Sequence, residues 1–310
     1  MDLSIVVVNW NTREMLRDCL QSVFNNIGAL EAEVFVVDNA SEDGSPDMVA
    51  AEFPQAILIR NAENRGFAAA NNQALTIARG EYVLLLNSDT LVLGAVLEAS
   101  QQYMNAHPGV GVLGCRVHNA DGSLQITCSK WPSLVNLALL TSGLWKLPGP
   151  AVLDRYQMAR WDRTDARSVD VVSGCYMFVR ASAMHEVGLL DESFFFYGEE
   201  TDWCRRFQDA GWQLNFAPVG AITHYGGGSV KRLNHRRDVM LTEATVRLHR
   251  KHGGLAAALA CWAMLAIFNF SRATFWSIAS LLRGSRAQER ARHFRRVVAA
   301  SARTWPECNA

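Results

Sequence analysis

Acidic side chains stand at three points of the sequence where a strand or a helix is expected to begin or end. Asp38 and Asp89 each follow an apolar run, and Glu199 and Glu200 open a stretch with helical periodicity. Ligands of parallel sheets gather at the carboxyl ends of the strands, so these acids are expected to converge on one edge of a sheet. Taken singly, an acid at such a position is also a common turn or capping residue.

Asp89 is the acid whose position points most directly to a metal ion. The strand expected before it, residues 82–86, has no polar alternation and should be covered on both faces. With Asn87 nearby, Asp89 offers the oxygen ligands that Mg²⁺ or Mn²⁺ prefers and leaves room for water and phosphate oxygens. The alternative is that Asp89 caps the helix expected after it.

A second cluster of polar residues lies in the loop "NAENRGFAAANN". Asn64, Arg65 and Gly66 stand immediately before an Ala-rich helical stretch. A diphosphate could meet backbone N–H groups, a helix N-terminus and a guanidinium group there. The loop has neither the G-x-G-x-x-G nor the P-loop pattern, which argues against an NAD site and against a P-loop NTPase. The alternative is a simple glycine turn.

The elements expected to position these residues alternate between strands and helices, with Thr12 as the cap of the first helix. Strands are expected at 3–8, 34–37, 56–59, 82–86, 111–116, 169–179 and 213–216, and helices at 12–25, 47–52, 68–79, 94–106, 181–186 and 200–210. Such alternation predicts an α/β fold with a mostly parallel sheet. The segment 119–168 is polar and interrupted by Trp and Pro, and is interpreted as an insert that covers the cleft.

Composition excludes some classes of protein. The 310 residues include 30 basic and 30 acidic side chains, so no overall charge steers the chain toward nucleic acid. Seven scattered cysteines without a C-x-x-C pair indicate neither a disulfide framework nor a zinc site, and fit a reducing cytosol. The apolar run 3–8 is interrupted by Asn9 and is expected to be a first strand rather than a secretory signal.

Five motifs in order carry a resemblance to a known family. They are "SIVVVNWNT", "VVDNASEDGS", "NAENRGFAAANN", "LLLNSDT" and "FFFYGEETDWCRRFQDAGW". Over residues 2–230 the chain resembles the family 2 glycosyltransferases with the GT-A fold, particularly the rhamnosyltransferase-like branch. The resemblance implies a mixed, mostly parallel sheet. It also implies transfer of a sugar from a nucleoside-diphosphate sugar.

The resemblance assigns a nucleotide-binding role to several residues. It implies that Val8, Asn9 and Asp38 hold the base and ribose, and that Asn64 and Gly66 belong to the loop on the nucleotide side. Asn87-Ser88-Asp89 corresponds to the D-x-D metal motif of the family, with Asp89 as the ligand of Mg²⁺ or Mn²⁺. This chain has Asn where the family has the first acid, which removes one negative charge from the site.

Further roles are carried over to the C-terminal part of the motifs. The resemblance implies that Glu200 is the catalytic base, with Glu199 as the reserve candidate. His224 is expected to be a metal or diphosphate ligand, although a lone His is more often structural. Lys231 with Arg232 could close over the diphosphate, or be solvated at the surface. Asp202 is expected to form helix-stabilising ion pairs with Arg205 and Arg206.

The chain changes character near residue 238, so a catalytic domain 1–237 and a helical region 238–310 are expected. Residues 253–270 carry no charge, and residues 283–303 hold seven arginines against Glu289 alone. A helix lying in the membrane interface is expected, with a packed or oligomer helix and a true span as alternatives. The arginines would suit anionic lipid headgroups, and the protein would be peripheral on the cytoplasmic face of the inner membrane.

The expected function is that of an inverting, metal-dependent glycosyltransferase in cell-surface polysaccharide assembly. dTDP-rhamnose is the first donor to consider, with a UDP-sugar as the other, and the acceptor is expected to be a glycan or a lipid-linked glycan. Acceptor specificity is expected in residues 119–168. The alternatives are a nucleotidyltransferase and a noncatalytic subunit that binds sugar nucleotides.

Overall fold

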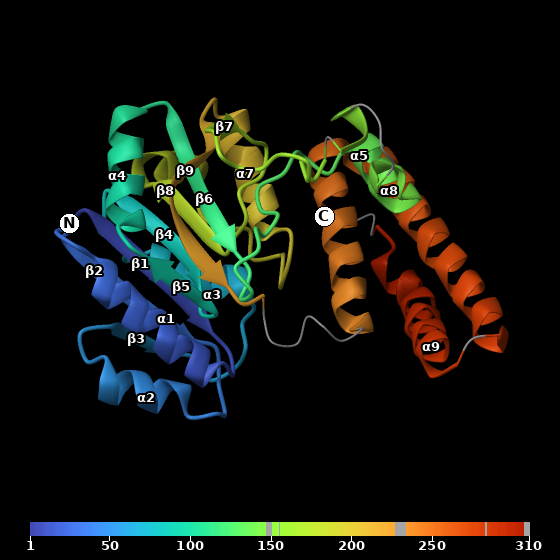
Figure 1. Ribbon diagram of the computed structural model, residues 1–310, viewed down its shortest axis with the longest axis horizontal. Helices are drawn as coiled ribbons and strands as arrows, with labels where there is room; N and C mark the ends of the chain where they lie inside the picture. The colour runs from blue at the N-terminus through green and yellow to red at the C-terminus, as the bar shows by residue number, and fades with distance from the viewer. Residues whose placement is uncertain (147–150, 155, 227–233, 283, 307–310) are drawn as a thin grey trace. The chain divides into compact units, whose positions relative to one another are not determined.

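The chain folds into two compact units. The computed structural model describes residues 1–146, 151–154, 156–226, 234–282 and 284–306 (Figure 1). The first unit comprises Met1–Lys130, Gln157–Phe195 and Glu199–Gly227, and the second comprises Trp131–Tyr156, Phe196–Gly198 and Gly228–Ala310. The expected boundary after residue 237 stays a prediction, and residues 131–156 of the expected insert group with the C-terminal helices.

One mixed sheet of nine strands forms the centre of the first unit within the described residues. The strand order is β3-β2-β1-β4-β8-β6-β9-β5, and β7 pairs with β9. The strands β1, β2, β3 and β4 are parallel to one another, whereas β8 is antiparallel to β4 and β6, and β5 is antiparallel to β9. The strand bounds are Leu3–Asn9 (β1), Ala32–Asp38 (β2), Ile57–Arg60 (β3), Tyr82–Asn87 (β4), Thr90–Leu93 (β5), Val110–His118 (β6), Arg167–Ser168 (β7), Tyr176–Arg180 (β8) and Gln213–His224 (β9).

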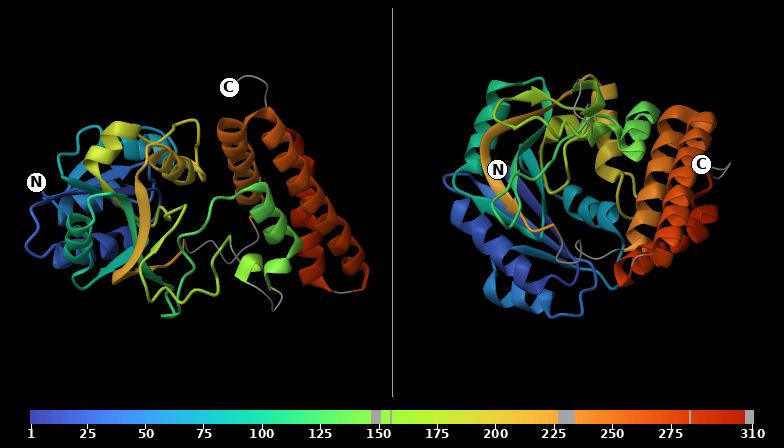
Figure 2. Two further views of the ribbon diagram at one scale, coloured as in Figure 1. Left: turned by 90° about the horizontal axis from the view of Figure 1, so that it is seen from above. Right: turned by 45° about the vertical axis from the view of Figure 1, so that its right-hand side comes forward.

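Helices cover both faces of this sheet (Figure 2). On one face, α1, α2 and α4 pack against alternate strand residues such as Ile5 and Leu84, and on the other α3, α6 and α7 pack against Val6 and Leu85. The prediction that residues 82–86 are covered on both faces is therefore confirmed. The helix bounds are Arg13–Asn26 (α1), Ser45–Glu52 (α2), Phe67–Leu75 (α3), Val96–Ala106 (α4), Ala181–Val187 (α6) and Glu199–Asp209 (α7).

The sequence predictions were wrong for several elements. The strand β8 begins at Tyr176 rather than near 169, and β9 continues to His224 rather than ending at 216. The continuation of β9 contains Gly220, which looks like a turn signal but has a packing role. A Cβ at Gly220 would lie 2.8 Å from Cβ of Val96, so the glycine allows α4 to approach the strand.

The second unit is helical. It contains α5 (Leu134–Ser142), α8 (His235–Leu282), α9 (Ser285–Ala300) and short 3₁₀ turns at Leu144–Lys146, Ala151–Asp154 and Ser301–Thr304. The helix α8 is interrupted at Gly254, whose φ is 76°. A small core joins α5 to α8 and consists of Leu137, Val246, Ala258 and Cys261. Within the described residues, α8 is the one helix long and apolar enough to cross a membrane.

Glu33 ties the first unit together at the end of the sheet where β1 and β2 begin. Ser4 Oγ donates to Glu33 Oε1 at 2.7 Å, the Arg79 amide donates to the same oxygen at 2.7 Å, and Arg79 Nη2 lies 2.8 Å from Oε2. Burial raises the pKa of the Glu33 carboxyl, but the hydrogen bonds from Ser4 and Arg79 outweigh it, so the pKa lies below its usual value.

We expect Glu33→Gln to lower the free energy of unfolding by about 1–3 kcal/mol at pH 7, because charge-assisted hydrogen bonds are lost. A carboxyl whose pKa is lowered on folding stabilises above its unfolded pKa, and loses this contribution as the pH falls through the folded pKa. The difference between Glu33→Gln and wild type should therefore shrink below about pH 4. Urea unfolding at pH 7 and at pH 3 measures it.

The exposed Glu31→Gln serves as the control, because Glu31 lies two residues away and pairs at the surface with the N-terminal amine. It is expected to change the free energy of unfolding by less than about 1 kcal/mol. Equal effects of the two variants would contradict the role given to Glu33.

Candidate active site

The strand register brings the predicted nucleotide residues to one edge of the sheet. Asn9 at the end of β1 is paired with Asp38 at the end of β2, and Val8 is paired with Asn87 at the end of β4. Parallel strands that end together leave their last side chains side by side. The structure therefore brings Val8, Asn9, Asp38 and Asn87 together at the carboxyl edge, where ligands of such sheets bind.

Asp38 is held by a local hydrogen-bond network. The Asn9 side-chain amide donates to Asp38 Oδ1 at 2.9 Å and to Ser41 Oγ at 3.0 Å. The Ser41 backbone N–H donates to Asp38 Oδ2 at 2.9 Å. Asp38 is only 3% exposed, so these bonds fix its carboxylate in one orientation. Ser41 was missed as a member of this cluster, although it belongs to the polar turn that follows β2.

Thr12 has a different role from the predicted one. It stands at the N-cap position of α1, but its side chain makes no capping hydrogen bond. Instead, Thr12 Oγ1 donates to Asn9 Oδ1 at 2.6 Å and lies 2.9 Å from Ser88 Oγ. The prediction of a capping side chain was wrong, because the hydroxyl connects Ser88 of the metal motif to the end of β1.

Backbone N–H groups at the loop before α3 form hydrogen bonds within the protein. Asn39 Oδ1 accepts from the Arg65 N–H at 3.1 Å, Asn64 Oδ1 accepts from the Gly66 N–H at 3.0 Å, and the Phe67 N–H donates to the Phe195 carbonyl at 2.9 Å. These three N–H groups hold the loop, and the Arg65 side chain is exposed.

Gly66 is more than a turn residue in this loop. Its φ is +82°, and a Cβ there would lie 2.5 Å from the carbonyl oxygen of Phe195. Glycine is required both for this backbone conformation and for the close approach of the two segments.

Asp89 does not cap a helix, because it is followed directly by strand β5 and the next helix begins at Val96. The capping alternative was therefore wrong. The pairing of β5 with β9 sets Thr90 opposite His224. As a result His224 Nε2 lies 3.2 Å from Asp89 Oδ1 and 3.3 Å from Asn87 Nδ2. Three polar side chains from β4, β9 and the turn between β4 and β5 thus converge.

Gln125 orients His224. His224 Nδ1 lies 2.7 Å from Gln125 Oε1, and an amide oxygen only accepts, so Nδ1 carries a proton and donates to it. In the neutral ring, Nε2 then presents its lone pair toward Asp89. Metal-bound His residues are typically held by a second-sphere acceptor in this manner. No sequence signal pointed to Gln125, which lies 99 residues from His224 along the chain.

These residues fit a divalent cation. A neutral imidazole nitrogen and a carboxylate oxygen that face each other at 3.2 Å repel unless a cation or a proton lies near both. Two ligands at about 2.1 Å from Mg²⁺ or Mn²⁺ in neighbouring octahedral positions stand about 3.0 Å apart. Asp89 and His224 therefore suit such an ion, and Asn87 would have to offer its oxygen rather than its nitrogen.

Glu199 and Glu200 begin helix α7, and the Oε2 atom of each is buried. Glu199 is 5% exposed, and its Oε2 is buried without a hydrogen-bond partner. Burial raises the pKa of the Glu199 carboxyl well above its usual value, and the neighbouring Glu200 raises it further. Glu200 is less deeply buried than Glu199.

Glu200 and the candidate metal ligands lie near the same two residues, Gly174 and Cys175. The Asn87 N–H donates to the Cys175 carbonyl at 3.3 Å, and a Cβ on the adjacent Gly174 would lie 3.9 Å from Cβ and Cγ of Glu200. Burial raises the pKa of the Cys175 thiol, and the charges of Cys128 and Asp89 add to this effect. The start of α7 and the end of β4 therefore meet across residues 174–175.

The remaining predictions for this region have mixed outcomes. Asp202 pairs with Arg206 at 2.9 Å as expected, whereas Arg205 pairs with Asp209. Lys231 and Arg232 lie outside the described residues, and their proposed contact with the diphosphate stays a prediction.

Comparison with known proteins assigns the chain. The model of the family described as "Glycosyl transferase family 2" matches residues 4–188. The chain belongs to glycosyl transferase family 2. Its activity is therefore transfer of a sugar, and the predicted family is confirmed. This family 2 glycosyltransferase is 28% identical over 218 residues to the N-acetylglucosaminyl-diphospho-decaprenol L-rhamnosyltransferase of Mycobacterium tuberculosis, covering 64% of this chain and 68% of the relative.

Solved structures confirm the GT-A fold of the glycosyltransferase. The mannosyltransferase PcManGT from Pyrobaculum calidifontis, solved with GDP-Man and Mn²⁺, has a TM-score of 0.56 at 18% identity over 97% of this chain and 86% of its own. S. aureus TarS 1-349, solved with UDP-GlcNAc, has a TM-score of 0.53 at 16% identity over 99% of this chain and 82% of its own.

We expect purified glycosyltransferase to bind Mn²⁺, and binding to weaken about 10-fold in Gln125→Ala because His224 loses its orienting partner. Asp89→Asn and His224→Ala each remove a candidate ligand and should weaken binding further. Titration of free Mn²⁺ by electron paramagnetic resonance measures the affinity. Asp47→Asn, an exposed acid paired with Arg60, is the control and should bind like wild type. Wild-type affinity in all three site variants would refute the metal assignment.

Proposed function

We propose that this glycosyltransferase moves a sugar from a nucleoside-diphosphate sugar to a hydroxyl group of a glycan acceptor with inversion at the anomeric carbon. The observation that carries the proposal is that Glu200 borders Gly174, and that the next residue, Cys175, accepts a hydrogen bond from Asn87, beside the Asp89 and His224 pair. A base and a cation site on one sheet edge are what such a transfer needs. Sugar transfer itself follows from the family.

The nucleotide is proposed to lie along the edge formed by β1, β2 and β4. Asn9 and Asp38, fixed by their mutual hydrogen bond and by Ser41, would contact the base and ribose. Asn64 and Gly66 would border the nucleotide, and Arg65 would meet the diphosphate, because its guanidinium suits phosphate oxygens. Ser88 would hold the metal motif through Thr12.

Mg²⁺ or Mn²⁺ bound at Asp89 and His224 would supply positive charge to the leaving diphosphate. Asn87 stands in place of an acid and lowers the negative charge of the site. The geometry of the site would therefore depend more on the His224 ring and on Gln125, which orients it. The Mn²⁺ in the mannosyltransferase complex supports a divalent ion in this fold.

Glu200 is proposed to remove the acceptor proton. The acceptor oxygen would attack the anomeric carbon, the bond from that carbon to the diphosphate oxygen would break, and the proton would pass to the Glu200 carboxylate. A single displacement from the opposite face inverts the configuration. The raised pKa of Glu199 supports this choice, because a carboxyl that holds its proton is a poor base.

The relatives support a choice of donor and acceptor. The Mycobacterium tuberculosis relative is named as an L-rhamnosyltransferase acting on an N-acetylglucosaminyl-diphospho-decaprenol, which favours dTDP-rhamnose and a lipid-linked glycan. The UDP-GlcNAc complex of TarS keeps a UDP-sugar as the second candidate. The role in cell-surface polysaccharide assembly rests on the same relatives.

We expect Glu200→Gln to lower kcat by about 10²–10⁴-fold, because the acceptor loses its general base. The KM for the donor should change by less than about 3-fold, since Gln keeps the size of the side chain. Acceptor-dependent release of nucleoside diphosphate from dTDP-rhamnose, with a polyprenyl-diphosphate-linked N-acetylglucosamine as acceptor, gives both constants.

The adjacent Glu199→Gln is the matched comparison, because it replaces a buried acid whose pKa is raised with a side chain of the same size, and kcat should fall less than about 10-fold. If Glu199→Gln loses activity and Glu200→Gln keeps it, the base is Glu199. If neither variant loses activity, the mechanism is wrong.

The donor can be tested by thermal unfolding with dTDP-rhamnose, UDP-GlcNAc and GDP-mannose, each with and without Mn²⁺. The true donor at 100 times its Kd should stabilise the fold by about 2.7 kcal/mol, and Mn²⁺ should increase the shift. Asp38→Asn should reduce the shift for the true donor because the nucleotide contact is weakened. A larger shift with UDP-GlcNAc than with dTDP-rhamnose would refute the rhamnose donor.

Two other functions predict different products. A nucleotidyltransferase would release pyrophosphate from a nucleoside triphosphate, and a noncatalytic subunit would bind the sugar nucleotide without releasing diphosphate. Family membership favours sugar transfer over both.

A further inference from the structure

The second half of α8 carries an apolar surface that the described residues leave uncovered. Its members follow one another at intervals of three and four residues, so they lie on one side of the helix. Ile267 is 70% exposed, Phe270 65%, Ile278 59% and Leu281 82%. With Thr274 between them they form the exposed stripe, Ile267, Phe270, Thr274, Ile278 and Leu281, which contains no charge.

The opposite side of α8 is lined by small residues. Ala258, Cys261 and Ala273 are buried, and the helix packs against α9, whose buried positions include Ala287 and Ala291. A helix of a water-soluble protein normally turns its large apolar residues inward. In the second half of α8 the most exposed apolar residues are large, whereas its buried apolar residue, Ala273, is small, a distribution typical of helices that lie in lipid.

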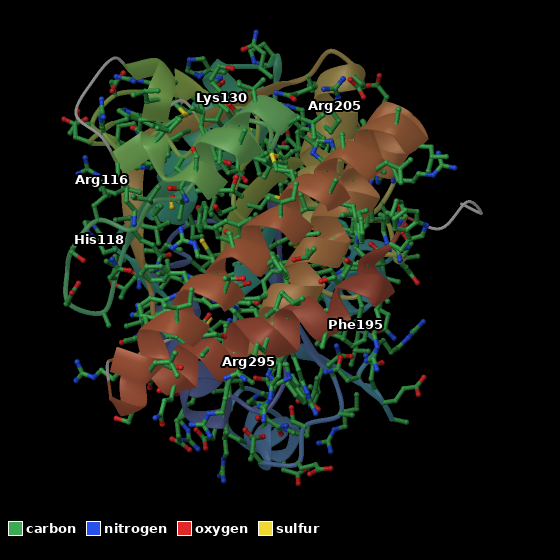
Figure 3. All side chains as sticks on the ribbon, turned by 90° about the vertical axis from the view of Figure 1, so that its right-hand side faces the viewer. Arg116, His118, Lys130, Phe195, Arg205 and Arg295 are labelled. Carbon is green, nitrogen blue, oxygen red and sulfur yellow. The ribbon has the colours of Figure 1, made fainter. Side chains whose placement is uncertain are left out.

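Arginines gather on the neighbouring helix. The helix α9 contains one acid, Glu289, and five exposed arginines. These arginines are Arg286, Arg290, Arg292, Arg295 and Arg296. Figure 3 labels Arg295 among them. The excess of positive charge makes α9 a surface that attracts anions.

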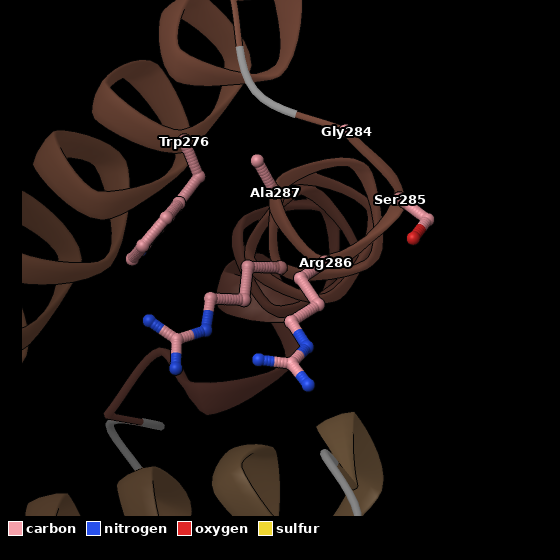
Figure 4. A pocket seen from close by; sticks show the side chains of 6 residues that line it. Trp276, Gly284, Ser285, Arg286 and Ala287 are labelled. Carbon is pink, nitrogen blue, oxygen red and sulfur yellow. The ribbon is translucent and has the colours of Figure 1, made fainter.

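A hollow of about 450 Å³ lies where α9 begins, lined by Trp276, Gly284, Ser285, Arg286, Ala287 and Arg290 (Figure 4). The Arg290 guanidinium lies 4.5 Å above the Trp276 ring. Trp276 comes from the turn of α8 between Thr274 and Ile278, so the arginines lie along the same stretch of the helix as the exposed stripe, but on the side turned toward α9. Trp beside Arg is the pairing found at the level of lipid headgroups.

We propose that the exposed stripe and the arginines of α9 bind the surface of an anionic lipid bilayer, with α8 lying in the plane of the interface. The stripe enters the apolar boundary of the bilayer, and Arg286 and Arg290 meet lipid phosphates. The six cysteines of the described residues are free and buried, which fits the cytoplasmic face of the inner membrane. This inference does not rest on the proposed function.

The structure favours the interface over a membrane span. One side of α8 is covered within its own unit by α5 and α9, through Leu137 and the small residues of the inner side. A spanning helix would carry the buried Asn269 and the charged Arg272 into the hydrocarbon, where such groups are unfavourable.

The structure also favours lipid over a second copy of the chain. Two copies that met through this surface would bring their α9 arginines together, and like charges repel. An anionic bilayer matches both the apolar and the positive parts of the surface.

The test is sedimentation of the full purified chain with lipid vesicles. One set of vesicles is pure phosphatidylcholine, and in the other about one lipid in three is the anionic phosphatidylglycerol. Wild type should partition onto the anionic vesicles more strongly, and salt should weaken this. Replacing three residues of the stripe should lower the partition coefficient at least about 10-fold on both vesicles. The substitutions are Ile267→Ser, Ile278→Ser and Leu281→Ser.

A matched control removes the same side chains from exposed positions of the first unit, namely Ile57→Ser, Ile77→Ser and Leu93→Ser. It should partition like wild type. Arg286→Gln with Arg290→Gln should abolish the preference for anionic vesicles, whereas Glu289→Gln should leave it unchanged or increase it. Circular dichroism shows whether each variant is folded, and the exposure of all these side chains makes folding of the variants expected.

Three outcomes would overturn the proposal. Vesicle binding of the stripe variant equal to that of wild type would exclude the stripe as the membrane surface. A concentration-dependent dimer in light scattering that the stripe variant loses, without vesicle binding by wild type, would assign the surface to a second copy. Resistance of the membrane-bound full chain to alkaline carbonate would show a span rather than an interfacial helix. Unaltered sugar transfer in a nonbinding variant would leave the catalytic proposal standing.

Discussion

The pairing of strand β5 with strand β9 is the contact on which the candidate site depends. These strands are antiparallel, and their register sets Thr90 opposite His224. Because Asp89 immediately precedes Thr90, the pairing places its carboxylate 3.2 Å from the imidazole of His224. A shift of the register by one residue would turn the His224 side chain to the other face of the sheet. The candidate cation site therefore depends on this register, and the Gln125 contact then fixes the ring.

The two ends of the candidate site differ in their electrostatic properties. Near β5 and β9, a carboxylate and an imidazole nitrogen face each other, an arrangement that favours a cation. At the start of α7, two adjacent glutamates differ in burial, and the pKa of Glu199 is raised by burial and by Glu200. Two acids with separated pKa values can hold one proton and one charge between them. The residues at these two ends suit the proposed roles of holding a cation and of removing the acceptor proton.

The sequence predicted the main strands and helices better than it predicted the contacts between side chains. Apolar runs without alternation predicted β1, β2 and β4, and the acids at their ends were found for the same reason. The four-residue β5 was missed because so short a strand has little periodicity, and α5 was missed inside the segment 119–168. Gln125 could not be found because its partner is distant in the chain. The role of Thr12 was wrong because a hydroxyl before a helix has both local and distant partners, and only the fold selects among them.

Charge distribution explains why a chain of zero net charge can still have one binding surface for anions. Residues 283–303 hold seven arginines and one acid, so the rest of the chain carries 23 basic against 29 acidic side chains. An anionic bilayer attracts the first group and repels the second, and both forces act within about 10 Å in physiological salt. The bilayer would then select one face of the chain. An overall excess of basic residues would give attraction without this selection, so the balance of charge itself favours a single orientation at the membrane.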